Sequence, residues 1–172
     1  SKRFEAELMN AINQLKAENS EIEEKAKHLA NALYGKIVAI YSTDRIEPVA
    51  LRFRQQINEN SKRLCWHHVI PEMNHNELVG WRKNDPNQVA LFLRNSDDHP
   101  RNSIRMDLTK EITSHYAGAA IELYSKGNSL IERSLYLVHL LDFVSVFLAD
   151  MNHVDAVEVK VIDFLKGELA KS

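Results

Sequence analysis

The strongest constraint on the fold is an alternation of short apolar runs with longer segments of helical spacing. The first run, Lys-Ile-Val-Ala-Ile-Tyr at 36–41, is rich in β-branched side chains and is bounded by Gly35 and by Ser-Thr-Asp at 42–44. A compact apolar run of this kind is typical of a strand buried on both faces. We expect three further strands, at 64–69, 88–94 and 119–124.

Helical segments precede and separate these runs. Apolar residues recur at steps of three and four through residues 1–33 and again through 46–61. Ser20 and Glu23 form a capping-box pattern, so we expect a second helix to begin at Ser20. The other expected helices are 74–83, 102–115, 129–152 and 156–171.

Strands that alternate with helices indicate right-handed βαβ units around a parallel sheet. We therefore expect an α/β protein, a three-layer α/β/α sandwich with a mainly parallel sheet. A length of 172 residues suits a single domain, 1–172. Helix 129–152 is apolar on nearly every side, which indicates burial in the core or in a subunit interface. The second alternative would make the chain a dimerisation domain.

Composition limits the classes of partner. With 22 basic and 24 acidic residues the net charge is −2, so we expect neither nucleic acid nor an anionic membrane as a partner. No apolar run approaches the roughly 20 residues of a membrane helix. The single cysteine, Cys65, fits a reducing cytoplasm and is expected in the core. The chain opens at Ser1 inside a charged helical pattern, which we interpret as part of a longer protein.

A dense polar cluster follows the strand at 64–69. In a parallel sheet the loops after the strands line the ligand crevice. Glu72 lies there, directly after Pro71, which fixes the backbone. A carboxylate whose pKa is raised by burial can carry a proton between neighbouring carbons. Alternatively, Glu72 belongs to the N-terminal cap region of the short helix at 74–83 and is favoured by its dipole.

Asn74, His75, Asn76 and Glu77 continue this cluster. Two amides around a histidine are costly in a core unless they are hydrogen-bonded. We expect Asn74, His75 and Asn76 to orient Glu72 or to bind sugar hydroxyls. The alternative is a solvated helix start in which Asn74 acts as the cap.

A second polar loop follows the strand at 88–94. Pro100 forces His99 out of helical geometry, and Asp97 or Asp98 could fix its tautomer. Arg101 lies at the start of the next helix, where an anion such as phosphate could bind. The alternative is an ordinary loop histidine.

Neither a metal nor an organic cofactor is expected. His67 and His68 are adjacent on a strand and so point to opposite faces of the sheet. The sequence has no HExxH or paired-cysteine spacing, no Walker loop and no GxGxxG fingerprint.

Several motifs together resemble the bifunctional phosphoglucose/phosphomannose isomerases. The resemblance runs from about residue 25 to the end and is to their C-terminal sugar-isomerase (SIS) domain, an α/β/α sandwich. The motifs are Gln-Ile-Asn-Glu-Asn at 56–60, Pro-Glu at 71–72, Asn-His-Asn-Glu at 74–77, Val-Gly-Trp at 79–81, Asp-His-Pro-Arg at 98–101 with Arg105, Thr-Lys-Glu at 109–111, Asp-Phe-Val-Ser at 142–145 and Val-Ile-Asp-Phe-Leu-Lys at 161–166.

This resemblance implies interconversion of glucose 6-phosphate and fructose 6-phosphate through an enediol, with mannose 6-phosphate as a second candidate substrate. Glu72 would move a proton between C1 and C2. His99 would help to open the sugar ring, reaching into the neighbouring subunit's site of a homodimer. Lys166 would assist ring opening and stabilise oxygen charge. Alternatively, Lys166 only complements a helix dipole.

Two departures from the family qualify this expectation. The family's phosphate-binding loops belong to an N-terminal SIS domain that this chain lacks, and here Asp44 would repel a phosphate. The helix start at 155–158 lacks the threonine and proline pattern associated with mannose-accepting members. We expect the chain alone to be inactive. The competing hypothesis is a SIS-type module that senses a sugar phosphate without catalysis.

Overall fold

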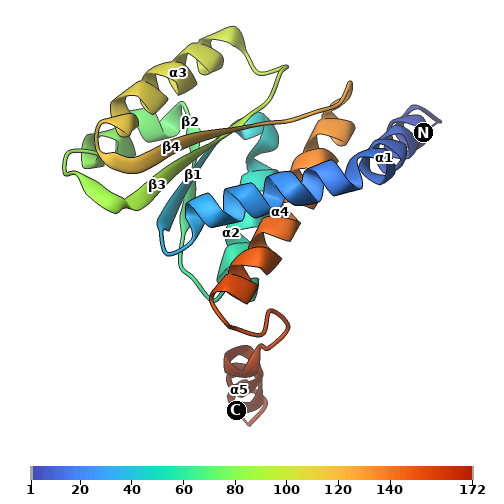
Figure 1. The fold of residues 1–172 in the computed structure, drawn as a ribbon, viewed down its shortest axis with the longest axis vertical. Coiled ribbons are helices and arrows are strands. Elements are labelled where there is room, and N and C mark those ends of the chain that lie inside the picture. The colour runs from blue at the N-terminus through green and yellow to red at the C-terminus, as the bar shows by residue number, and fades with distance from the viewer. Residues whose placement is uncertain (1, 172) are drawn as a thin grey trace.

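The computed structural model, which describes residues 2–171, has a four-stranded sheet between two helical layers (Figure 1). The strands are β1 (Ile37–Thr43), β2 (Trp66–Ile70), β3 (Asp85–Arg94) and β4 (Ala117–Tyr124), in the order β2-β1-β3-β4. All three pairings are parallel. The predicted three-layer α/β/α class with a parallel sheet is therefore confirmed.

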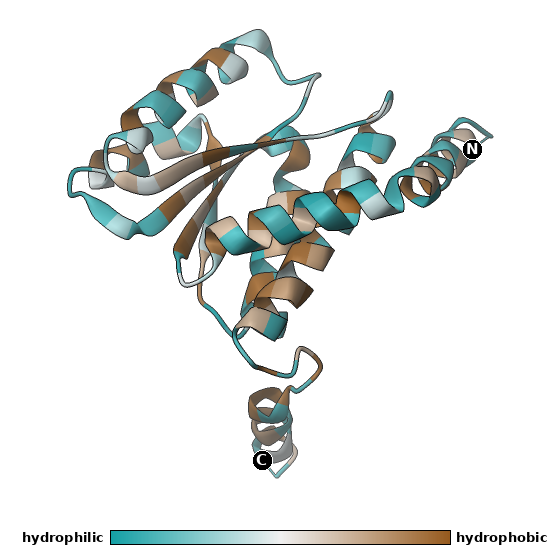
Figure 2. Cartoon of the chain, in the orientation of Figure 1, coloured by the Kyte–Doolittle hydropathy of each residue, from teal (hydrophilic) through white to brown (hydrophobic). Residues whose placement is uncertain are grey.

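Three long helices cover one face of this sheet: α1 (Lys2–Leu33), α2 (Glu47–Asn60) and α4 (Leu130–Met151). A short 3-10 turn, η1 (Asp44–Ile46), joins β1 to α2. Alternate strand residues such as Ile40 and Leu91 point into this layer, where they pack with Phe53 and Leu140. Figure 2 shows the apolar residues of the strands and of α4 gathered in this part of the molecule.

The opposite face of the sheet is covered by α3 (Pro100–Ser114) and by two 3-10 turns, η2 (Glu72–His75) and η3 (Glu77–Gly80). Tyr41 and Phe92 point to this side, with ring centroids 5.3 Å apart. Met73, Trp81 and Met106 complete this second core. The last helix, α5 (Lys160–Leu169), extends away from the sheet beyond the end of α4 (Figure 1).

Two predicted elements are wrong. No new helix begins at Ser20, because α1 runs unbroken from Lys2 to Leu33. Residues 74–83 do not form an α-helix either. Residues 74–80 belong to η2 and η3, which are separated at Asn76, where φ is −137° and ψ is −66°, and residues 81–83 lie beyond η3. The other elements occur where expected, with ends that differ by a few residues.

Helix α4 also needs a correction. From the sequence we expected no apolar run long enough to span a membrane. Helix α4, however, is 22 residues long and apolar enough to do so by length and composition. Its buried residues include Leu137, Leu140 and Val144, which pack in the core beneath α1 and α2. This packing within one chain accounts for part of its apolar composition, and the proposed dimerisation role of α4 stays a prediction.

Candidate active site

The candidate site lies at the carboxyl end of the sheet. Because all four strands are parallel, the segments that follow them emerge at the same edge. The segment after β2 carries Glu72, and the segment after β3 carries His99. The sequence therefore correctly predicted that these two polar residues follow strands at the carboxyl edge of the sheet.

Glu72 is the first residue of η2 and is exposed. Its Oε1 atom accepts a hydrogen bond from Asn76 Nδ2 at 3.2 Å. The carboxylate is thus tethered on one side and open to solvent on the other, so a ligand can reach it. The expected burial of this carboxylate is not present in the single chain.

The amides beside Glu72 have different surroundings. Asn74 Nδ2 donates to Thr109 Oγ1 at 2.8 Å, which ties η2 to α3. Asn74 Oδ1 is buried and has no hydrogen-bond partner among the described residues. Asn76 contacts Glu72 directly, as one of the two proposed uses of these amides requires. His75 is exposed at the end of η2.

Glu77 is the best-connected acid of this segment, and its surroundings were not anticipated from the sequence. Its Oε1 atom accepts from Tyr41 Oη at 2.5 Å and from Trp66 Nε1 at 2.8 Å. Its Oε2 atom lies 2.8 Å from His68 Nδ1. Trp81 Nε1 in turn donates to Tyr41 Oη at 2.9 Å. The signal for this cluster was the two-residue spacing of Trp66 and His68, which places both on one face of β2.

His99 caps the N-terminus of α3. Its Nδ1 atom accepts from the backbone N–H of Arg101 at 3.2 Å, and the residue is exposed. Within the described residues no hydrogen bond or ion pair joins His99 to Glu72. Arg101 is also exposed, in the first turn of the helix. The cap accounts for the orientation of His99 without excluding a second role for its other ring nitrogen.

A network of charged groups braces the His99 loop. Asp97 Oδ2 lies 2.5 Å from Arg133 Nη2 and 2.8 Å from Arg45 Nη2. Burial tends to raise the pKa of Asp97, but hydrogen bonds from Arg45 and Asn95 and the charge of Arg133 lower it overall. Thr43 Oγ1 at the end of β1 donates to the neighbouring Asp98 at 2.7 Å. Among the described residues no hydrogen bond or ion pair joins either aspartate to the His99 ring, so the structure does not show the expected tautomer control.

Lys166 lies on α5, far from the carboxyl edge of the sheet (Figure 1). Every residue of α5 is exposed. One chain therefore brings Glu72 and Asn76 together but leaves Lys166 at the other end of the molecule.

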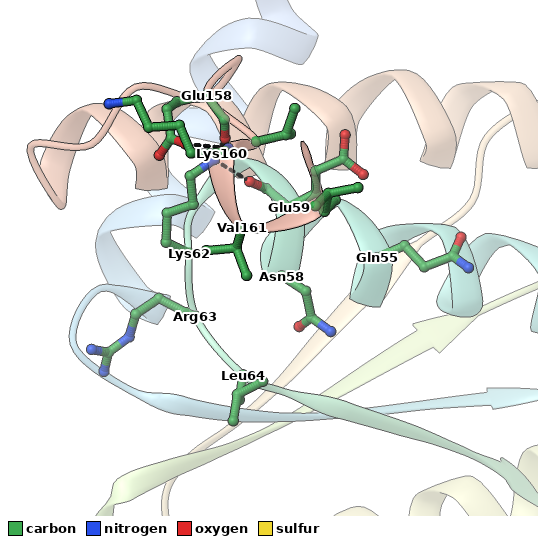
Figure 3. A pocket seen from close by; sticks show the side chains of 11 residues that line it. Gln55, Asn58, Glu59, Lys62, Arg63, Leu64, Glu158, Lys160 and Val161 are labelled. Carbon is green, nitrogen blue, oxygen red and sulfur yellow. Dashed lines mark hydrogen bonds between the residues drawn. The ribbon is translucent and has the colours of Figure 1, made fainter. Parts of the chain in front are cut away.

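A cleft of about 480 Å³ lies beside α5, between its first residues and the end of α2 (Figure 3). Leu64 and Val161 give the cleft apolar walls, and Lys62 Nζ donates to the carbonyl oxygen of Glu158 at 2.6 Å. Its lining residues in the described chain include none of the predicted catalytic side chains.

The histidines that could bind a metal and the one thiol have separate surroundings in the described chain. Within residues 2–171 no three His, Cys, Asp or Glu side chains converge as metal ligands would. His67 and His68 do face opposite sides of the sheet: His67 lies near Glu47 of α2 and His68 near Glu77. Burial raises the pKa of the Cys65 thiol to about 12, which makes it a poor nucleophile.

A comparison with known families assigns the chain. The family described as "Bacterial phospho-glucose isomerase C-terminal SIS domain" matches residues 22–169. The chain belongs to this family. The resemblance identified from the sequence motifs is thereby confirmed.

Related proteins of this SIS family are about twice as long. A bifunctional phosphoglucose/phosphomannose isomerase of Aquifex aeolicus (strain VF5) is 42% identical over 96% of the chain and 52% of the relative. The protein of the same name in Caldicellulosiruptor bescii is 38% identical over 95% of the chain and 50% of the relative. The SIS chain thus spans about half the length of the curated relatives that it matches.

A solved structure supports the fold of this SIS domain. A hypothetical protein from Thermus thermophilus superposes with a TM-score of 0.73, covering 96% of this chain and 49% of that chain. The two sequences are 13% identical, so this likeness concerns the fold alone.

Proposed function

We propose that these 172 residues are the C-terminal half of a sugar-phosphate aldose–ketose isomerase. The enzyme interconverts glucose 6-phosphate and fructose 6-phosphate through an enediol, with mannose 6-phosphate as a second candidate substrate. Membership of the SIS family carries this proposal, and the names of two relatives at 42% and 38% identity support it. We place the enzyme in the cytoplasm.

Glu72 is proposed as the base. A carboxylate at this position takes a proton from C2 of the open-chain aldose and returns it to C1 of the enediol, so that no proton is gained or lost overall. The exposed carboxylate, held by Asn76 at the carboxyl edge of the sheet, supports this assignment. A bound sugar and a covering partner would exclude water from around this acid.

The remaining groups act at oxygens. His99 and Lys166 are proposed to assist ring opening by moving protons at the ring oxygen and by stabilising oxygen charge. Asn74, His75 and Arg101 are proposed to bind the sugar and its phosphate. Because Lys166 lies far from Glu72 in one chain, the complete site requires further protein. We propose that a second copy of the chain and an N-terminal SIS domain supply it.

The decisive experiment compares Glu72→Gln with the parent in the full-length protein. We expect kcat for fructose 6-phosphate to fall by at least about 10³-fold while the sugar phosphate still binds, because glutamine cannot accept the proton. Glu111→Gln, an exposed acid on α3, is the matched control and should leave kcat unchanged. The 172-residue chain alone should show no turnover in a coupled assay.

A non-catalytic sensing module is the alternative, and the same experiment separates it. A sensor would bind the sugar phosphate with no turnover in the full-length parent, and Glu72→Gln would leave its affinity unchanged. Turnover by the full-length parent that survives Glu72→Gln would instead refute Glu72 as the base.

A further inference from the structure

We infer that Arg133 is a positioning residue that holds the loop 95–99 and thereby sets the place of His99. The inference rests on the proposed isomerase function, in which His99 acts at the ring oxygen, and it does not depend on which acid moves the proton between C1 and C2. None of the sequence motifs includes Arg133. The observation behind it is one buried guanidinium that joins the loops after β3 and β4.

The guanidinium of Arg133, near the start of α4, makes a separate contact with each of its three nitrogens. Its Nε atom donates to Asn95 Oδ1 at 2.8 Å, and its Nη2 atom lies 2.5 Å from Asp97 Oδ2. Its Nη1 atom donates to the carbonyl oxygens of Gly127 and Asn128 at 3.4 and 3.3 Å. Only the planar fork of an arginine can serve all of these acceptors at once.

The loop that Arg133 holds is also braced from within and from β1. Asn95 Nδ2 donates to Asp97 Oδ1 at 2.5 Å and to Asp98 Oδ1 at 3.2 Å. The backbone N–H of Asp98 donates to the carbonyl oxygen of Asn95 at 3.2 Å. Thr43 Oγ1 at the end of β1 donates to Asp98 Oδ1 at 2.7 Å. Residues 95–98 therefore form a hydrogen-bonded turn that is held by β1 and by α4.

His99 follows this turn directly. Its Nδ1 atom accepts from the backbone N–H of Arg101 at 3.2 Å, which fixes the ring relative to α3. Because Nδ1 accepts, a neutral ring carries its proton on Nε2, the nitrogen that is left to act at a sugar oxygen. The place of His99 relative to the sheet depends on residues 95–98, and so on Arg133.

Burial makes Arg133 an unusual choice for a purely structural contact. Its side chain is 7% exposed, and Asn95 is also buried. A buried charge costs free energy unless it is paired and hydrogen-bonded. Farther along α4, Leu140 and Val144 pack on the core through apolar contacts alone. A guanidinium at position 133 instead gives the polar groups of two loops a common donor.

The test substitution is Arg133→Lys in the full-length protein. A lysine ammonium can stay beside Asp97 but cannot also reach Asn95 and the two carbonyl oxygens. We expect kcat for fructose 6-phosphate to fall at least about tenfold with KM within about threefold. Leu140→Ala, at a buried position of the same helix, controls for lost stability and should keep kcat within about twofold where circular dichroism shows both variants folded.

A double-mutant cycle separates positioning from a general loss of structure. In a His99→Ala background we expect Arg133→Lys to lower kcat by less than about twofold, because the residue that it positions is gone. A merely structural role would lower kcat by the same factor in both backgrounds. His99→Ala should keep measurable turnover, since sugar rings also open slowly in water without a catalyst.

Backbone hydrogen exchange gives a readout that does not depend on turnover. The N–H groups of Asp98 and Arg101 donate within this part of the chain. We expect Arg133→Lys to speed their exchange at least about tenfold, and Leu140→Ala to leave it unchanged. An inactive parent would refute the proposed function, and a His99→Ala variant with the parent's kcat would refute the role of His99. In either case the exchange still decides whether Arg133 holds the loop.

The inference fails if Arg133→Lys keeps the parent's exchange at Asp98 and Arg101. It also fails if the tenfold loss of kcat persists unchanged in His99→Ala. Should Arg133→Lys not fold, Asp97→Asn decides, because it weakens the same ion pair from its more exposed side. A kcat reduced at least about threefold at constant KM then supports positioning, and an unchanged kcat refutes it.

Discussion

Asp97 shares one carboxylate oxygen between two arginines of very different burial. The Arg133 side chain is 7% exposed and that of Arg45 is 48% exposed. Arg133 also donates to buried Asn95 Oδ1 at 2.8 Å, so its loss removes a buried donor from both Asn95 and Asp97. We expect Arg133→Ala to lower the free energy of unfolding by about 2–3 kcal/mol and Arg45→Ala by less than about 1 kcal/mol. Urea unfolding measures both, and equal losses would contradict this account.

His67 should make stability sensitive to pH. Burial lowers the pKa of His67 below 6.5, and the charge of Arg54 lowers it further, although Glu47 acts in the opposite direction. The unfolded chain then binds a proton more readily than the folded chain does. Its contribution to stability is therefore lost as the pH falls through the unfolded value toward the lower folded one.

The test of this pH effect is the free energy of unfolding at pH 7.5 and pH 5.5. We expect the loss on acidification to be smaller in His67→Gln than in the parent. His28→Gln, at an exposed position of α1, serves as the control and should lose as much stability as the parent. An identical loss in all three proteins would show that His67 does not carry the effect.

The close approach of β4 to β3 at its start requires a glycine at position 118. A Cβ atom built on Gly118 would lie 2.2 Å from the carbonyl oxygen of Pro86 in β3, and a backbone atom cannot move aside cheaply. We expect Gly118→Ala to cost about 1–3 kcal/mol of unfolding free energy. Gly80→Ala is the matched control, since its Cβ would meet no atom within 4 Å. A neutral Gly118→Ala would mean that the two strands separate easily there.

The strands were the most predictable elements because their signal is local. The β-branched run at 36–41 strongly favours a strand, and β1 occupies 37–43. The predicted break at Ser20 was wrong because apolar contacts of α1 with the core, through Ile22 and Ala26, continue the helix across the capping pattern. Tertiary packing outweighed a local propensity there.

The candidate site was predictable in place but not in detail. Sequence position put Glu72 and His99 after strands, and the structure agrees. The 3-10 turns at 72–80 were not predicted. They form in place of a helix because the side-chain oxygen of Asn76 accepts a hydrogen bond from the N–H of Glu77, which competes with helix formation. The contacts of Glu77 with Tyr41 are long-range, and no spacing along the chain encodes them.

The molecule combines a closed core with an outlying helix. Helix α4 is mainly apolar and buries one side in the core, whereas α5 carries both apolar and charged residues and has no buried residue. On α5, Val161 is 81% exposed and Phe164 is 70% exposed. Contiguous exposed apolar surface of this kind usually marks a contact with other protein. The exposure of this helix therefore agrees with the proposal that further protein completes the site around Lys166.

This division predicts that α5 adds little to the stability of the isolated chain. Truncation after Val159 removes no residue that is buried among the described part of the chain, so we expect the midpoint of thermal unfolding to change by less than about 3 °C. The loss of exposed apolar surface should also reduce self-association, measured by sedimentation. Leu140→Ala, at a fully buried position of α4, is the contrasting control and should cost about 2–5 kcal/mol. If the truncation were as damaging as Leu140→Ala, α5 would have to pack on the core of its own chain, and Lys166 would then need no partner to be held in place.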